Sequence, residues 1–107
     1  MVQRQLDAYN NHDLQAFLAT YSEDVVLYRV PTTTPAISGK QQLADFYRTS
    51  RFNLPDLHAE LLHRTIVGNK IVDHERISGL RSQPVEAVAA YVVRDGLIHS
   101  VWLFYPE

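Results

Sequence analysis

The chain has 107 residues, of which 46% are hydrophobic, and a formal net charge of -2. This length is sufficient for one domain with a real core, and we expect a single domain over residues 1–107. The absence of cysteine excludes disulfide and thiolate chemistry. Interspersed charges argue against nucleic-acid binding, and no apolar run reaches the ~18 residues of a membrane span. Residues 1–7 lack the apolar region of a signal peptide, so we expect a cytoplasmic protein without membrane contact.

The first half of the chain predicts three helices and one strand. Apolar residues recur at helical spacing over residues 2–10, 14–21 and 40–51. The β-branched and aromatic run over residues 25–30 is typical of a strand. Two prolines between residues 31 and 35 prevent this strand from continuing.

The second half predicts a run of antiparallel strands. We expect strands over residues 57–67, 70–78, 85–94 and 97–105, with a tight turn at Gly68-Asn69. Asp95-Gly96 between the last two is a strong hairpin signal. The order of elements predicts an α+β fold with helices on one face of a bent sheet.

Three stretches of the sequence resemble the NTF2-like superfamily, and within it the SnoaL-like and ketosteroid-isomerase-like proteins. They are NHDLQAFLATYSEDVV at residues 11–26, ISGKQQLADFYR at 37–48 and VVRDGLIHSVW at 92–102. The resemblance implies an NTF2-like (cystatin-like) cone, with three N-terminal helices packed in a strongly curved, mostly antiparallel sheet. It implies an internal pocket but no particular activity, because this fold serves enzymes and non-enzymes alike.

The resemblance also argues against two known chemistries of the fold. Ketosteroid isomerases use an aspartate base, an oxyanion tyrosine and a protonated aspartic acid, and the matching positions here hold Arg29, Gln5 and Ala90. Relatives of limonene epoxide hydrolase use an Asp-Arg-Asp set, of which only the arginine is matched, by Arg76. Neither activity is therefore expected.

The strand over residues 70–78 carries the candidate catalytic residues. The resemblance implies that His74, Arg76 and Ser78 point into the cone, and because successive side chains of a strand lie on opposite faces, Asp73 and Glu75 are then expected to point outward. His74 is then a candidate general acid/base, and Arg76 a candidate holder of an anion. The alternative is that both side chains pair with acids on neighbouring strands.

The remaining pocket is expected to be aromatic with a few cationic or titratable groups. Such a cavity suits a flat organic ligand that carries a carboxylate, enolate or phenolate. The strand over residues 57–67 alternates poorly, so the facing of His58 and Glu60 stays open. No two of the five histidines have metal-ligand spacing, and no metal or other cofactor is expected. The expected ligand-binding residues are Tyr9, Phe17, Arg29, Phe46, Tyr47, His99 and Tyr105.

The outer face of the last strands is expected to be a large apolar patch. A homodimer that buries it is the simplest physical explanation for such a patch on a soluble protein. The expected interface residues are Tyr91, Val93, Trp102 and Phe104.

Three functions remain open from the sequence. The first is a small isomerase, lyase or cyclase that acts on an aromatic or polyketide-like compound without the usual ketosteroid isomerase carboxylates. The second is a non-catalytic module that binds a small hydrophobic, anionic ligand. The third is a dimeric interaction domain with a filled cone. The absent carboxylates favour the last two, whereas charges projected into the cone count against the third.

Overall fold

The structure, a computed structural model, describes residues 1–106. Most predicted elements are confirmed to within a few residues, but the second helix ends at Leu18 and the first strand begins at Tyr21. A short strand was not predicted at all. In order, the elements are α1 (Val2–Asn10), α2 (Leu14–Leu18), β1 (Tyr21–Arg29), β2 (Ile37–Ser38), α3 (Lys40–Ser50), β3 (His58–Val67), β4 (Lys70–Ser78), β5 (Val85–Arg94) and β6 (Leu97–Phe104).

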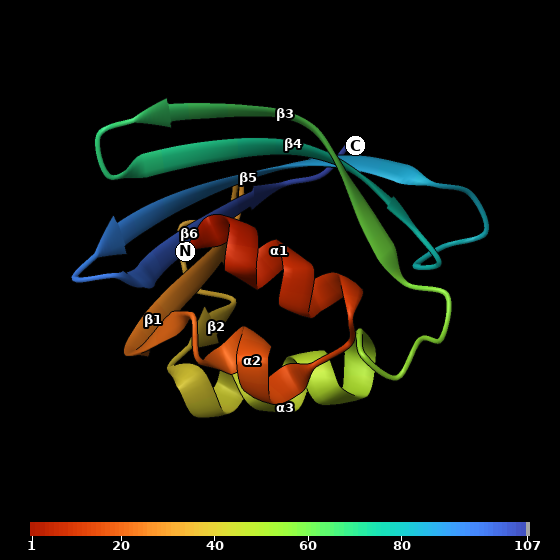
Figure 1. The fold of residues 1–107 in the computed structure, drawn as a ribbon, viewed down its shortest axis with the longest axis horizontal. Helices are drawn as coiled ribbons and strands as arrows, with labels where there is room; N and C mark the ends of the chain where they lie inside the picture. The colour runs from red at the N-terminus through yellow and green to blue at the C-terminus, as the bar shows by residue number, and fades with distance from the viewer. Residues whose placement is uncertain (107) are drawn as a thin grey trace.

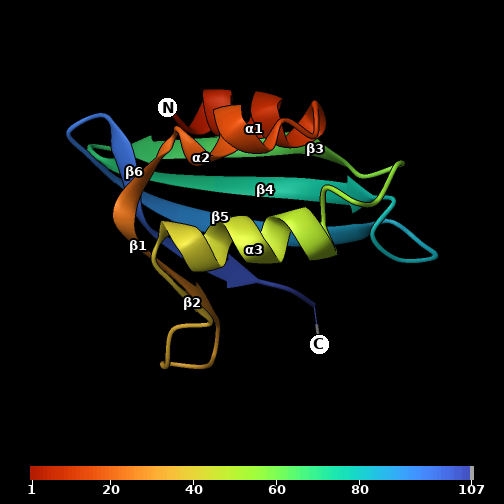
Figure 2. The same ribbon diagram turned by 90° about the horizontal axis from the view of Figure 1, so that it is seen from below.

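The six strands form one curved sheet in the order β2-β1-β6-β5-β4-β3. Only the β1–β6 pair is parallel; the other neighbours are antiparallel. All three helices lie on one side of the curved sheet (Figures 1 and 2). This arrangement confirms the predicted α+β cone. No helix within residues 1–106 is long and apolar enough to cross a membrane.

Helix α1 is fastened to the start of β3 by side-chain hydrogen bonds. The Asn10 amide donates to the Ala59 carbonyl at 2.9 Å and accepts from the Ala59 N–H at 2.7 Å. The His12 ring N–H donates to the Leu57 carbonyl at 2.7 Å. These contacts hold α1 at a fixed distance from the sheet, and its buried face, which includes Gln5 and Tyr9, is directed into the cone.

A bulge changes which residues of the edge strand β3 point inward. In β3 the pairing with β4 shifts between Leu61 and His63, so Ala59 is buried before the shift and Arg64 turns inward after it. This shift explains the poor alternation of the sequence, and it leaves His58 and Glu60 exposed.

Candidate functional site

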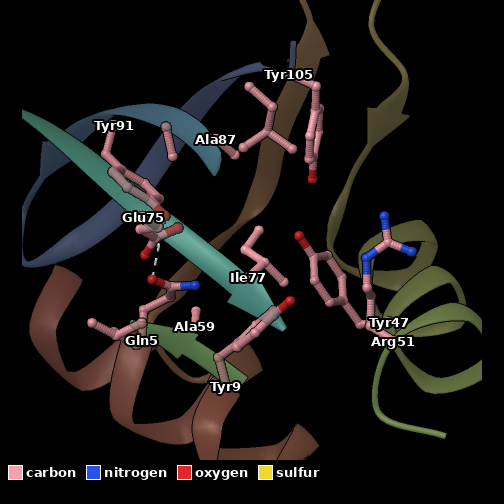
Figure 3. Close-up of a pocket in the computed structure, with 13 residues that line it drawn as sticks. Gln5, Tyr9, Tyr47, Arg51, Ala59, Glu75, Ile77, Ala87, Tyr91 and Tyr105 are labelled. Atoms are coloured by element: carbon pink, nitrogen blue, oxygen red, sulfur yellow. Dashed lines mark hydrogen bonds between the residues drawn. The ribbon is translucent and has the colours of Figure 1, made fainter. Parts of the chain in front are cut away.

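A cavity lies between α1, the C-terminal end of α3 and the concave face of β3 to β6 (Figure 3). It is narrow, with a volume of about 40 Å³ measured as the space open to the centre of a water molecule. A single water needs roughly 10–15 Å³ on this measure, so the cavity holds a few waters or a small ligand. It is lined by Gln5, Leu6, Tyr9, Tyr47, Arg51, Ala59, Glu75, Ile77, Ala87, Ala89, Tyr91, Leu103 and Tyr105.

The faces of β4 are the reverse of the sequence prediction. Asp73 and Glu75 point into the cone and are only 0% and 8% exposed, while His74 and Arg76 lie on the outer face. The prediction took the facing of β4 from the family resemblance. In the structure the apolar Ile77, which shares a face with the two acids, is buried in the core and fixes that face as the inner one.

Glu75 supplies the carboxyl among the residues that line the cavity. Within residues 1–106, no hydrogen bond or ion pair engages this carboxylate, whose oxygens are not fully enclosed by protein. Burial is the main reason that the pKa of Glu75 rises from 4.5 to about 7; the nearby charge of Asp73 adds to this rise, and Arg64 partly offsets it. Glu75 therefore exchanges a proton near neutral pH.

Asp73 forms the buried ion pair next to Glu75. Its two carboxylate oxygens accept from Nε and Nη2 of Arg64, directly across the β3–β4 pair, at 2.7 and 2.9 Å. Arg64 Nη1 also donates to Gln3 Oε1 of α1 at 2.9 Å. This bidentate geometry keeps the charge of Asp73 fixed two residues from Glu75 on the same face of β4.

Tyrosine hydroxyls surround the space in front of Glu75. Burial raises the pKa of Tyr9, Tyr47 and Tyr91, and the Glu75 charge contributes to the rise in each case. These phenols stay protonated at neutral pH and act as hydrogen-bond donors. Tyr91 donates to Gln5 Oε1 at 3.4 Å, and the hydroxyls of Tyr9, Tyr47 and Tyr105 point into the same space (Figure 3).

The predicted catalytic pair is placed away from the cavity. His74 Nε2 lies 2.6 Å from Glu86 Oε1, and Arg76 Nη1 donates to Glu60 Oε1 at 3.3 Å. Both pairs join neighbouring strands on the outer face, which was the alternative reading of the sequence. The prediction that His74 and Arg76 point inward is wrong, so their assignment as catalytic residues loses its basis.

The predicted ligand-binding residues divide into three groups. Phe17 is 0% exposed and packs against Tyr21, Tyr47 and Phe52, so it belongs to the core and does not line the cavity. His99 also lies outside the cavity, with its Nδ1 3.9 Å from Asp24. Three of the predicted residues do line the cavity, namely Tyr9, Tyr47 and Tyr105. The other two, Arg29 and Phe46, do not line it but pack on each other nearby.

The predicted dimer residues also divide by face. Tyr91 points into the cone and Val93 packs against the core, so their outward placement is wrong. Both faces of β5 are apolar, and the pattern of the strand alone does not separate them. Trp102 and Phe104 do lie on the outer face, where Trp102 stacks on Tyr28 with ring centroids 5.5 Å apart.

The sequence contained a signal for the residues that were missed. Ile71 and Ile77 are the two most apolar residues of β4, and they share their face with Asp73 and Glu75. Period-2 alternation of apolar residues would therefore have placed both acids inside. Arg51 follows α3 in the chain, and no strand or helix pattern marked it as a lining residue. Within residues 1–106, no cluster of three or more potential metal ligands occurs.

Comparisons with known proteins agree on the fold. A family model described as a SnoaL-like domain matches residues 2–101. A proposed ketosteroid isomerase from Kribbella flavida is 22% identical, with a TM-score of 0.85 over 99% of this chain and 75% of that one.

Two further solved structures are similar. A proposed polyketide cyclase from Sinorhizobium meliloti is 21% identical, with a TM-score of 0.81 over 95% of this chain and 91% of that one. A SnoaL-like protein of unknown function from Burkholderia thailandensis is 20% identical, with a TM-score of 0.82 over 98% and 90% of the two chains. No protein with a curated description matches the chain. At these identities the solved structures establish the fold alone.

Proposed function

The chain belongs to the SnoaL-like domain family, and from this premise we propose that it is an enzyme that moves a proton on a small organic substrate held in the cone. The observation that carries the proposal is Glu75, a buried carboxyl without a partner among residues 1–106, whose pKa of about 7 suits a general acid/base. The substrate class is a carbonyl compound, because the protonated phenols around the Glu75 carboxyl can donate hydrogen bonds to a carbonyl oxygen.

The proposed step is proton transfer at a carbon next to a carbonyl group. The Glu75 carboxylate takes the proton, the C–H bond breaks, and its electron pair moves to the carbonyl oxygen to give an enolate. Tyr9 and Tyr47 donate hydrogen bonds to that oxygen, which gains charge during the step. The Glu75 carboxylic acid then returns the proton to the same carbon or to a conjugated one, which restores the enzyme.

The location of the carboxyl answers the objection that the sequence raised. The positions of the ketosteroid isomerase acids hold Arg29 and Ala90, but β4 supplies a different carboxyl in Glu75. Two similar structures are described as a proposed isomerase and a proposed cyclase, which agrees with proton-transfer chemistry. The narrow cavity favours a small substrate with at most one ring.

Hydrogen–deuterium exchange at the α-carbon of small ketones in D₂O tests this function directly. Cyclohexanone and acetophenone serve as probes, and ¹H NMR follows the loss of the α-proton signal. The wild type is expected to accelerate exchange, with a rate that rises as pH increases through about 7 and Glu75 ionises. Glu75→Gln is expected to lower the rate at least about a hundredfold, the typical contribution of a general base.

Glu60→Gln on β3 is the matched control, because Glu60 is an exposed glutamate on the outer face of the next strand. Its exchange rate should equal that of the wild type. If the wild type binds the ketones without accelerating exchange, the protein is the non-catalytic binding module instead.

We also propose that two copies pair through the outer sheet face. The stacked Tyr28 and Trp102 lie there with half-exposed apolar side chains, among them Val72 and Phe104 at 39% and 42% exposure. Trp102→Asp places a charge in this patch and should convert a dimer to a monomer in light scattering. A dimer that persists unchanged in this variant would place the contact elsewhere.

A further inference from the structure

Two arginines from different elements meet on one aromatic ring at the edge of the cavity. The Cζ atom of Arg29, at the end of β1, lies 5.0 Å from the centroid of the Phe46 ring. The Cζ atom of Arg51, which follows α3, lies 4.9 Å from the same centroid. Arg51 also lines the cavity (Figure 3). The fold therefore brings two guanidinium groups to one aromatic ring, and one of them borders the cavity.

Among the residues that the structure describes, these two charges lack the acidic partners that arginines usually have. Both side chains are half-buried, yet within residues 1–106 neither pairs with a carboxylate. The other arginines either pair with an acid or are exposed to water. The paired ones are Arg48, Arg64 and Arg76, and the exposed ones are Arg4, Arg81 and Arg94.

Packing on Phe46 stabilises the charge of the guanidinium groups but does not engage their N–H donors. A cation–π contact attracts the charge through the face of the ring, but the N–H donors in the guanidinium plane stay available. Arg51 uses one donor on the Ser50 carbonyl, at 2.7 Å. The positive charges of both arginines also reach the Tyr47 hydroxyl, whose pKa they lower against the larger rise caused by burial.

We propose that Arg29 and Arg51 form a carboxylate-binding subsite, so that the substrate is a small planar carboxylic acid. Its acid group lies beside Phe46, and its reacting end reaches past Tyr47 toward Glu75. A carboxylate is the planar anion that matches the fork of guanidinium donors, and the flat Phe46 ring keeps both forks in place. This inference rests on the proposed function. The ligand's carboxylate would lie at the arginines, and its opposite end would lie at the catalytic group, Glu75.

A charged and a neutral ligand of the same shape test the subsite. Benzoate and benzamide are titrated into the protein by calorimetry at about pH 6, where benzoate is ionised and Glu75 is largely protonated. The wild type should bind benzoate about tenfold more tightly than benzamide, because charge-assisted hydrogen bonds contribute only to the acid. The double variant Arg29→Met/Arg51→Met should bind both ligands equally.

Two controls separate recognition from folding. Arg48→Met removes an exposed arginine of α3, three residues before Arg51, and should keep the full preference for benzoate. The double variant Arg29→Lys/Arg51→Lys keeps both charges and should retain part of the preference, even if the methionine variant is unstable. Equal binding of the two ligands by the wild type, or an unchanged preference in the methionine variant, would overturn the subsite.

The result is independent of turnover. A preference for benzoate without any proton exchange on ketones would keep the subsite and reject the proposed enzyme. Proton exchange that depends on Glu75, without a preference for benzoate, would keep the proposed enzyme and reject the subsite.

Discussion

Glu75→Gln is expected to stabilise the fold at pH 8 by about 3 kcal/mol relative to the wild type. Folding raises the pKa of Glu75 from 4.5 to about 7, and each pKa unit corresponds to roughly 1.4 kcal/mol. Below pH 4.5 the carboxyl is protonated in both states and adds no penalty. Between pH 4.5 and about 7 the wild type loses stability as pH rises, and above that range the penalty is constant.

Urea denaturation of the wild type and the glutamine variant at pH 4.5, 6 and 8 measures this effect. The difference between the two free energies of unfolding isolates Glu75, because other titrating groups are common to both proteins. The difference should grow in favour of the variant as pH rises. A difference that stays constant from pH 4.5 to 8 would mean that Glu75 titrates normally. Glu60→Gln should show no such trend.

Arg64→Met is expected to destabilise the fold by about 3–5 kcal/mol at neutral pH, because it leaves the fully buried Asp73 carboxylate without a counter-charge. Methionine keeps most of the apolar volume of the arginine side chain, so the loss of stability measures the effect of removing the charge. Urea denaturation at neutral pH measures this loss, and a loss close to zero would contradict a structural role for the pair.

Asp73→Asn gives the matched comparison. Arg64 is about a fifth exposed and keeps its hydrogen bond to Gln3, so the loss of stability should be smaller than in Arg64→Met. The two variants should also move the pKa of Glu75 in opposite directions. Loss of the Arg64 charge raises it above about 7, and loss of the Asp73 charge lowers it. Shifts of the same sign would mean that the pair does not act on Glu75 through its charges.

The elements of this fold were predictable because their signals are local. The Asp95-Gly96 turn, with Asp95 at φ 51° and Gly96 at φ 75°, forms the hairpin expected from the sequence. Strand β4 was predicted with its correct bounds. The strand β2 was missed because two residues are too few to show the alternation of apolar and polar side chains that indicates a strand. Its pairing with β1 depends on tertiary contacts.

The site was less predictable because it depends on strand register. A slip of one residue in the assumed facing of β4 exchanges His74 and Arg76 for Asp73 and Glu75. The counter-charge of the buried Asp73 comes from Arg64, nine residues earlier on the neighbouring strand. The bulge in β3 that turns Arg64 inward shows in the sequence only as poor alternation, which does not say which side chains face the core.

The proposed chemistry depends on Glu75, which exchanges a proton near neutral pH inside the cone. Carbon-detected NMR titration of protein labelled with ¹³C at the glutamate side-chain carboxyl measures this directly, and the signal missing in Glu75→Gln identifies the group. A midpoint of about 7 is the predicted result. A midpoint near the ordinary glutamate value of about 4.3 would contradict the account.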